Sequence, residues 1–480
     1  MNCGRVPVEG LKGGLAYHGY ESVSGYEGAK PQYDTQGYRW SATEYNSNNS
    51  RNCNFGSGNF NNNNKNWSFL VRPVVAYDVP EGFLDLVIAA FEDCCRNKRT
   101  SAECIAYLER AADDLPRLAH ELYTCTYRPG ASTCFLVRYP QYREVFAAGF
   151  RDRIVHHFIY LLLNPHFEKR FRAQGNVSFN CRKGFGTLAA QRAAYAAIRE
   201  ATDGYRTEAW VYRGDLVSFF MSIDKRGLWR RLEPFIRSEY RGEYLRPLLY
   251  AARTVVFHCP QRLCTLNTPS GEWRRHIEEG KSLFACGDNF GMPIGNLTTQ
   301  VFANFLMSFF DEWAADWLTG HGCQRHYVRF VDDFVAVCPN KSLLKRFARD
   351  AKEFLQSRLG LTLHSRKHHF QPASHGLRFV GAYAKNGRMY LASRTVARMT
   401  ERVYGFNRML ERKRTVTLAD LTRVEQVVNS YLGFCKGKRT YAIRKRALGQ
   451  LGHGFYKYFY IGGHYERIRL KRGARLVQAA

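Results

Sequence analysis

The chain has 480 residues, 45% of them hydrophobic, and this length suggests two to four domains with an ample core. Lys and Arg exceed Asp and Glu by 29, which indicates a polyanionic partner and salt-dependent binding. No apolar run is long enough to span a bilayer, and the N-terminus lacks the charged-then-apolar pattern of a signal peptide. We therefore expect a cytoplasmic protein without membrane contact.

The first 77 residues have an unusual composition. Eleven of the 21 residues from Asn46 to Asn66 are Asn, embedded among Gly, Ser and aromatic residues, which is typical of low-complexity sequence. A sequence of ordinary globular composition begins near Val79. It predicts amphipathic helices at residues 84–95 and 102–122, the second interrupted at residues 113–116 (DDLP).

Three carboxylates lie at the ends of predicted strands. Residues 209–214 (AWVYRG) predict a strand that ends at Asp215, and residues 327–334 (YVRFVDDF) predict a hairpin with Asp332 and Asp333 at its tip. Adjacent carboxylates repel each other unless a cation lies between them, and hard oxygen ligands suit Mg²⁺ in nucleotidyl transfer. Asp-Asp is also a favourable turn dipeptide, so the hairpin alone leaves both interpretations open. Asp215 supplies the further ligand that a two-metal site needs.

A loop rich in Gly and Pro lies between these two motifs, at residues 291–300 (GMPIGNLTTQ). The segment after it has hydrophobic residues at helical spacing, namely Val301, Phe302, Phe305, Leu306, Phe309, Phe310 and Trp313. We expect a buried helix here.

The C-terminal part is strongly basic, with 18 Lys and Arg against five Asp and Glu in residues 401–480. Aromatic residues are interleaved with these cations: Tyr431, Phe434, Tyr441, Phe455, Tyr456, Tyr458, Phe459 and Tyr460. Such a segment favours nucleic-acid binding; the alternative is a solvent-exposed helical face over ordinary core aromatics. The 14 cysteines include no Cys-x-x-Cys pair, and the loose spacing of Cys259, Cys264 and Cys286 around His258 disfavours structural zinc.

The order Asp-x₃-Phe-Phe, then Gly-x-Pro-x-Gly before a helix, then Asp-Asp resembles the palm of a reverse transcriptase. Similar family motifs flank it, at residues 143–148 (REVFAA), 151–157 (RDRIVHH), 181–187 (CRKGFGT), 361–367 (LTLHSRK) and 377–381 (LRFVG). The resemblance covers roughly residues 115–385. It implies an α+β right-hand polymerase with an irregular N-terminal extension. The expected parts are fingers at 78–207, a palm at 208–390 with an insertion of strands and loops at 236–287, and a basic helical thumb at 391–480.

The resemblance also implies the residues of the site. Asp215 and Asp332 would be the main ligands of two Mg²⁺ ions, with Mn²⁺ as an alternative; Leu216 also belongs to the metal site, and Asp333 completes or supports it. Phe220 matches the sugar gate that favours deoxynucleotides. The other implied substrate-binding residues are Arg182 and Lys183 over the triphosphate, Ile294, Gly295 and Gln300 in the loop, and Lys367 at the pyrophosphate leaving group. For Lys367, a solvent-exposed lysine without a catalytic role is an equally good interpretation. We expect Asp224 to cap a helix.

The loop resembles a particular subfamily. Most reverse transcriptases have Gln at position 294 and Ser-Pro at 299–300, whereas IGNLTTQ, preceded by KSLF at 281–284, is similar to the enzymes of diversity-generating retroelements. These enzymes copy a template RNA with errors at adenines. An Ile side chain lacks the hydrogen-bonding groups of Gln, which is consistent with looser nucleotide selection but does not explain the choice of adenine. The implied partners are template RNA, the cDNA primer–template duplex, dNTPs and a small basic accessory protein.

The N-terminal segment fits the same subfamily. Residues 40–45 (WSATEY) and 71–73 (VRP) resemble the C-terminal end of the lectin-like proteins that these retroelements diversify. We interpret residues 1–77 as a translated template repeat, since both Asn codons begin with two adenines. The alternative is a genuine extension that binds RNA or a partner. For the whole chain, the alternatives are a retron or group II intron polymerase, a non-catalytic RNA-binding palm protein and a lectin-like adhesin.

Overall fold

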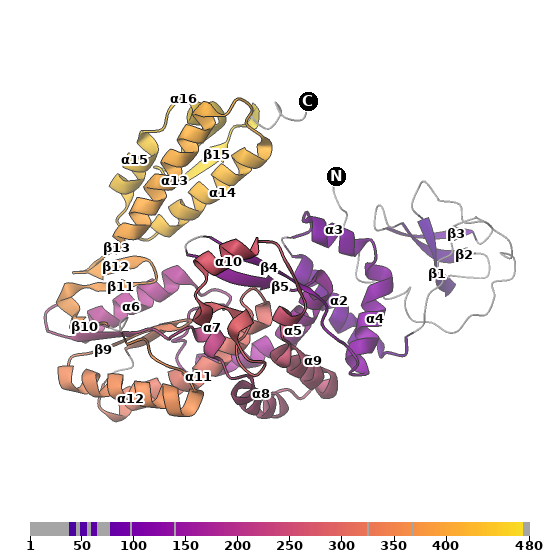
Figure 1. Cartoon of the computed structure of the whole chain (residues 1–480), viewed down its shortest axis with the longest axis horizontal. Helices are drawn as coiled ribbons and strands as arrows, with labels where there is room; N and C mark the ends of the chain where they lie inside the picture. Colours follow the sequence, from indigo (N-terminus) through magenta and orange to yellow (C-terminus); the bar gives the residue numbers. More distant parts are fainter. Residues whose placement is uncertain are drawn as a thin grey trace. The chain divides into compact units, whose positions relative to one another are not determined.

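The computed structural model describes residues 38–44, 49–54, 59–64, 77–96, 98–138, 141–323, 326–365 and 369–473 (Figure 1). The chain combines helices with small sheets, which confirms the expected α+β class. Its contacts divide it into two units, one made of Met1–Arg170 and Ser218–Leu306, the other of Phe171–Val217 and Met307–Ala480. No helix of the described residues is long and apolar enough to cross a membrane.

The first unit is mainly helical after an N-terminal sheet. The strands β1 (Tyr38–Glu44), β2 (Asn49–Asn54) and β3 (Asn59–Asn64) form an antiparallel sheet within the Asn-rich segment. The other elements are α2 (Glu81–Cys95), α3 (Ala102–Leu108), α4 (Ala111–Tyr123), β4 (Ser132–Val137), β5 (Arg143–Ala147), most of α5 (Phe150–Ala173), α7 (Phe219–Ser222), α8 (Lys225–Glu239), α9 (Leu245–Phe257), η1 (Pro260–Arg262), β7 (Cys264–Leu266), α10 (Ser270–His276), η2 (Glu279–Lys281), η3 (Leu283–Ala285) and the start of α11 (Leu297–Gly320).

The helix boundaries in this unit differ from the sequence prediction. The break between α3 and α4 falls at Glu109 and Arg110, so the expected interruption at residues 113–116 is wrong. Asp113 and Asp114 instead occupy the first turn of α4. Acidic side chains there interact favourably with the helix dipole, and Pro116 is accommodated near the start of the helix.

The inserted segment at 236–287 also differs from its prediction. It consists mainly of α9 and α10 with short 3₁₀ turns, and β7 is its three-residue strand. The expected insertion of strands and loops is therefore wrong in its secondary structure. Buried Glu144 of β5 attaches the segment, because its carboxylate accepts hydrogen bonds from Trp273 Nε1 (2.7 Å), Ser282 Oγ (2.8 Å) and the Leu283 amide (2.7 Å).

The second unit contains an antiparallel sheet in the order β10–β6–β9–β8, with α6, α11 and α12 packed on it. Its elements are the end of α5, α6 (Thr187–Ala201), β6 (Trp210–Gly214), the rest of α11, β8 (Tyr327–Phe330), β9 (Asp333–Cys338), α12 (Lys341–Leu359), β10 (His369–Pro372), η4 (Ala373–His375), β11 (Leu377–Phe379), β12 (Ala382–Lys385), β13 (Arg388–Leu391), α13 (Ser393–Arg412), α14 (Leu418–Cys435), α15 (Tyr441–Gly449), α16 (His453–Tyr458), β14 (Phe459–Gly462) and β15 (Arg467–Leu470).

Both faces of this sheet are covered, as the apolar composition of its strands requires. Alternate residues of a strand point to opposite faces. Val211, Val335 and Val337 join the core that contains α6, whereas Tyr212 and Phe334 lie on the other face against rings of α11 and α12. This packing holds the strand ends, and the carboxylates that follow them, on a rigid base.

Residues 391–470 contribute a separate hydrophobic cluster within the second unit. Helices α13 to α16 and the hairpin β14–β15 share one hydrophobic core, so the expected helical segment also contains a small sheet. Of the aromatic residues in this region, Phe455 and Phe459 are buried in that core, whereas Phe434, Tyr441, Tyr456 and Tyr460 are exposed. The exposed rings are available to a partner, and the buried ones have a structural role.

Candidate active site

The hairpin predicted around the two adjacent carboxylates is present. Strands β8 and β9 pair antiparallel, and Phe330 faces Asp333 in the last pair. Val331 and Asp332 form the turn, and Val331 has a φ of +61°. A β-branched residue in this region is strained, and such strain persists only where the surrounding structure fixes the backbone. Asp332 is therefore presented, partly exposed, at a rigid tip.

Asp215 lies beside this tip because β6 ends where β9 begins. The two strands are antiparallel neighbours, with Gly214 opposite Phe334. The backbone continues into a short pairing with residues 362–364: the amide of His364 donates to the Asp215 carbonyl (2.8 Å), and the amide of Val217 donates to the Thr362 carbonyl (2.9 Å). These bonds fix the backbone of Asp215 and of Leu216, which is itself buried.

Arg213 interacts with all three carboxylates and forms hydrogen bonds with Asp333. Its Nε and Nη2 atoms donate to Oδ1 and Oδ2 of Asp333, both at 2.7 Å. Burial raises the pKa of Asp333, and the Arg213 guanidinium partly offsets this shift. The pKa of Arg213 is raised although burial opposes its charge, because Asp333, Asp215 and Asp332 all favour the cation. One guanidinium therefore experiences the charge of every carboxylate of the site.

The donor set fits a hard divalent cation. Asp215, Asp332 and the carbonyl of Leu216 are oxygen donors, and Mg²⁺ commonly binds one or two carboxylates and completes its shell with substrate phosphates and water. Among the described residues, no three His, Cys, Asp or Glu side chains converge as a metal-binding group. This agrees with the engagement of both Asp333 oxygens by Arg213.

The model of the reverse transcriptase (RNA-dependent DNA polymerase) family matches residues 140–383, which is half of the chain and includes both carboxylate motifs. The chain belongs to the reverse transcriptase family. No curated protein sequence matches it.

Solved structures similar to this reverse transcriptase include telomerases. Apo telomerase from Candida tropicalis matches with a TM-score of 0.41 and 10% identity, over 68% of this chain and 59% of that chain. Telomerase from Candida albicans in complex with a TWJ fragment of telomeric RNA matches with a TM-score of 0.40 and 11% identity, over 66% and 56%. The reverse transcriptase thus spans a little over half the length of these telomerase chains.

The two residues assigned to the triphosphate differ in their surroundings. Arg182 is buried: its Nη1 donates to the Ser178 carbonyl (2.8 Å), its Nη2 donates to Asn176 Oδ1 (2.7 Å), and its guanidinium lies 4.0 Å from the Phe185 ring centroid. Lys183 is exposed. Lysine 183 can therefore meet a ligand directly, whereas Arg182 fixes its loop. Lys367 lies outside the described residues.

Phe220 and the 291–300 loop belong to the first unit, separately from the carboxylates. Phe220 and Ile294 pack against the same small core. The Ile294 carbonyl accepts a hydrogen bond from the Phe146 amide (2.8 Å). Gly295 has a φ of +129°, and a Cβ there would lie 2.6 Å from the Phe146 carbonyl oxygen, so this position requires glycine. Gln300 is partly buried in α11.

A buried ion pair beneath the hairpin was not predicted from the sequence. Arg329 and Asp311 are both fully buried, and Nε and Nη2 of Arg329 donate to the two oxygens of Asp311 at 2.7 and 2.6 Å. Tyr327 Oη donates to the same carboxylate (2.9 Å), and Arg329 Nη1 donates to the Val331 carbonyl (2.8 Å). The pair thus holds the strained turn residue that precedes Asp332. Two features of the sequence could have indicated this pair: Asp311 lies within an apolar helix, and Arg329 lies within an apolar strand.

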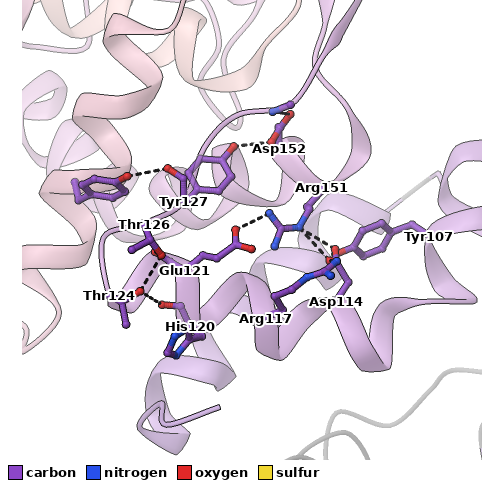
Figure 2. Close-up of polar contacts among 12 residues, drawn as sticks. Tyr107, Asp114, Arg117, His120, Glu121, Thr124, Thr126, Tyr127, Arg151 and Asp152 are labelled. Atoms are coloured by element: carbon purple, nitrogen blue, oxygen red, sulfur yellow. Dashed lines mark hydrogen bonds and ion pairs between the residues drawn. The ribbon is translucent and has the colours of Figure 1, made fainter. Parts of the chain in front are cut away.

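The family motif at 151–157 contributes to a second polar cluster, shown in Figure 2. Arg151 bridges Asp114 (3.0 Å) and Glu121 (2.8 Å) of α4, and Tyr107 and Arg117 also donate to Asp114. Burial opposes ionisation of Asp114, but the hydrogen bonds from Tyr107 and Arg117 lower its pKa. The motif therefore ties α5 to α4.

Three further residues from the sequence analysis form hydrogen bonds within the protein. Asp224 caps α8, accepting a hydrogen bond from the Arg226 amide (2.9 Å), as expected. Asp152 of α5 is buried and accepts hydrogen bonds from Tyr127 Oη (2.6 Å) and the Gly130 amide (3.0 Å). Cys259 accepts a hydrogen bond from Lys225 Nζ (3.3 Å).

Proposed function

We propose that this chain is an RNA-directed DNA polymerase that extends a primer along template RNA with dNTPs. The observation that carries the proposal is the position of Asp215 and Asp332 at adjoining strand ends within the family match. Separate strands that deliver carboxylates to one edge are what a two-metal site needs. Fingers at 78–207, palm at 208–390 and thumb at 391–480 remain the proposed division of the chain.

The chain's residues would bind and orient the reacting groups. Asp215, Asp332 and the Leu216 carbonyl would hold two Mg²⁺ ions, with Mn²⁺ as an alternative. When bound, these ions supply charge stabilisation and lower the pKa of the primer 3′-hydroxyl. The rigid hairpin and the 362–364 pairing hold the carboxylates in position before substrate arrives. Such preorganisation, rather than covalent chemistry, supplies most of the rate in phosphoryl transfer.

Other residues are proposed to contact the substrate. Lys183, with Arg182 holding its loop, would bind the triphosphate of the incoming nucleotide. Phe220 would exclude a ribose 2′-hydroxyl, Ile294, Gly295 and Gln300 would line the nucleotide pocket, and Lys367 would protonate pyrophosphate. In the thumb, the exposed rings of Phe434, Tyr441, Tyr456 and Tyr460 lie among basic residues that would bind the phosphates of the primer–template duplex.

We propose further that the enzyme belongs to a diversity-generating retroelement. Ile294 supports this role, because an aliphatic side chain stands where most reverse transcriptases carry Gln. The enzyme would copy a template-repeat RNA into adenine-mutagenised cDNA, with a small basic accessory protein as partner, and residues 1–77 would be a translated copy of the repeat. Loss of a polar contact reduces discrimination between substrates, which is the physical basis for the errors.

The test is primer extension on a defined RNA template, followed by sequencing of the cDNA. The proposal predicts extension with dNTPs, errors concentrated opposite template adenine, and fewer such errors in Ile294→Gln. Extension with errors spread evenly over the four bases would reject the retroelement role and favour a retron or group II intron type. A wild-type protein that binds RNA without extending the primer would instead indicate a non-catalytic palm.

A further inference from the structure

We propose that Arg213 is a positioning residue that withholds Asp333 from the metal site, so that Asp215 and Asp332 provide the carboxylate ligands. This inference rests on the proposed polymerase function. The family resemblance leaves open whether Asp333 completes or supports the metal site, and the contact with Arg213 favours the supporting role. Asp333 is the partner of the Arg213 guanidinium, whereas Asp332 is assigned to the metal.

The geometry of the pair carries the proposal. Arg213 Nε and Nη2 each lie 2.7 Å from a different oxygen of Asp333, so both oxygens accept a charge-assisted hydrogen bond. The third nitrogen, Nη1, donates to the Arg378 carbonyl of β11 at 3.2 Å. The side chains of Arg213 and Asp333 are 23% and 16% exposed, so solvent screens the pair only partly. The arginine is thus anchored on two sides.

The strand register explains why the arginine competes with a metal. Arg213 lies opposite Val335 and Gly214 lies opposite Phe334 in the β6–β9 ladder. Residues two apart on a strand share a face. Arg213 therefore shares a face with Asp333 of the neighbouring strand, and Asp215 follows directly after the end of β6. The cation lies beside the catalytic carboxylates, where it occupies the oxygens that a third ligand would offer.

Two consequences follow for the charge of the site. When both groups are ionised, the Arg213–Asp333 pair is neutral, so it adds no net charge to that of Asp215 and Asp332. Removing the guanidinium alone would release both oxygens of Asp333 and take a positive charge away from the site, so a divalent cation should bind more tightly. Removing both charges would leave the net charge unchanged and should leave cation binding close to that of the wild type.

The experiment is a Mn²⁺ titration of the full chain, with free Mn²⁺ measured by electron paramagnetic resonance. Arg213→Met should bind Mn²⁺ about tenfold more tightly, which corresponds to ~1.4 kcal/mol. The double variant Arg213→Met/Asp333→Asn should bind within about twofold of the wild type, since it leaves no partly buried charge unpaired. Asp332→Asn should lose at least tenfold. Arg206→Met, which removes an exposed pair with Asp203, is the matched control and should change nothing.

The double variant decides the inference. If it loses Mn²⁺ affinity as Asp332→Asn does, Asp333 is a metal ligand and the proposal is wrong. Unchanged affinity in Arg213→Met would also overturn it, because a purely structural ion pair would give that result. A wild-type chain that binds no Mn²⁺ and extends no primer would reject the polymerase function itself, a result distinct from both.

Discussion

Gly214, the last residue of β6, packs directly against the ring of Phe334 at the start of β9. A Cβ on Gly214 would lie 2.5 Å from Cζ and 2.7 Å from Cε1 of that ring, well inside van der Waals contact. The absence of a side chain at Gly214 thus allows the strand that delivers Asp215 to approach the hairpin that delivers Asp332 and Asp333. The spacing of the carboxylates depends on this contact.

Gly214→Ala should separate the two strand ends. Phe334 is fully buried, so the added methyl group must push the ring or the strand, and overpacking of this kind costs ~1–3 kcal/mol. We expect lower thermal stability. We also expect primer extension to fall further than the fraction of unfolded protein explains. The matched control is Gly405→Ala in α13, where a Cβ meets no atom within 4 Å. Full activity in a folded Gly214→Ala protein would contradict the role of this contact.

Removal of one partner of the Asp311–Arg329 pair should strongly destabilise the chain. Asp311→Ala leaves the guanidinium of Arg329 buried without its carboxylate, and removal of one partner from a buried pair costs ~3–5 kcal/mol. Denaturant unfolding measures this loss. Arg206→Ala, which breaks an exposed pair with Asp203, should cost less than ~1 kcal/mol. Similar effects of the two substitutions would show that the buried pair does not hold the hairpin.

His156 should make stability depend on pH. Burial lowers its pKa to about 3, and its Nδ1 lies 2.7 Å from Thr298 Oγ1. The unfolded chain therefore binds a proton near the usual pKa of about 6.5 that the folded chain does not bind. Stability is fully present above pH 6.5 and falls toward pH 3, with a slope of up to ~1.4 kcal/mol per pH unit from this residue.

Urea unfolding between pH 7 and pH 5 measures this slope, and His156→Gln should reduce it. Burial also lowers the pKa of His157 and of His258, so some dependence should remain in the variant. An identical slope in wild type and His156→Gln would show that His156 is protonated in the folded protein.

Residues 1–77 should contribute little to catalysis if they are a translated template repeat. A variant that begins at Asp78 should retain polymerisation on a separately supplied RNA. The neighbouring DNA should contain a near-identical stretch at the 3′ end of a lectin-like gene, with differences concentrated at the codons of Asn46 to Asn66. An inactive but folded Asp78 variant, with no such repeat nearby, would make the segment a functional extension.

Local patterns made much of the sheet that bears the carboxylates predictable. The alternation of residues 327–334 and the strand before Asp215 depend on period-two patterning and turn residues, which act over a few positions. The structure confirms the hairpin, β6 and the apolar helix α11. The predicted helix interruption at residues 113–116 is wrong, because these residues lie in the first turns of α4.

The long-range pairings could not be predicted in the same way. Asp311 and Arg329 are 18 positions apart, Arg213 and Asp333 are 120 apart, and Glu144 is over 100 from its partners. Each pairing depends on how strands and helices pack against one another, and a single sequence does not show this packing. Buried acids such as Asp311 and Glu144 are visible only as polar residues in apolar surroundings.

Primer extension by aspartate variants tests the central claim most directly. Wild type, Asp215→Asn, Asp332→Asn and Asp224→Asn should be compared on one RNA template with Mg²⁺, and folding of each should be verified by circular dichroism. Asn preserves shape but removes a metal-binding charge, so Asp215→Asn and Asp332→Asn should lose at least ~100-fold in rate. Asp224→Asn should match the wild type, because Asn caps a helix as well as Asp. Extension at near wild-type rate by folded Asp332→Asn would contradict the account.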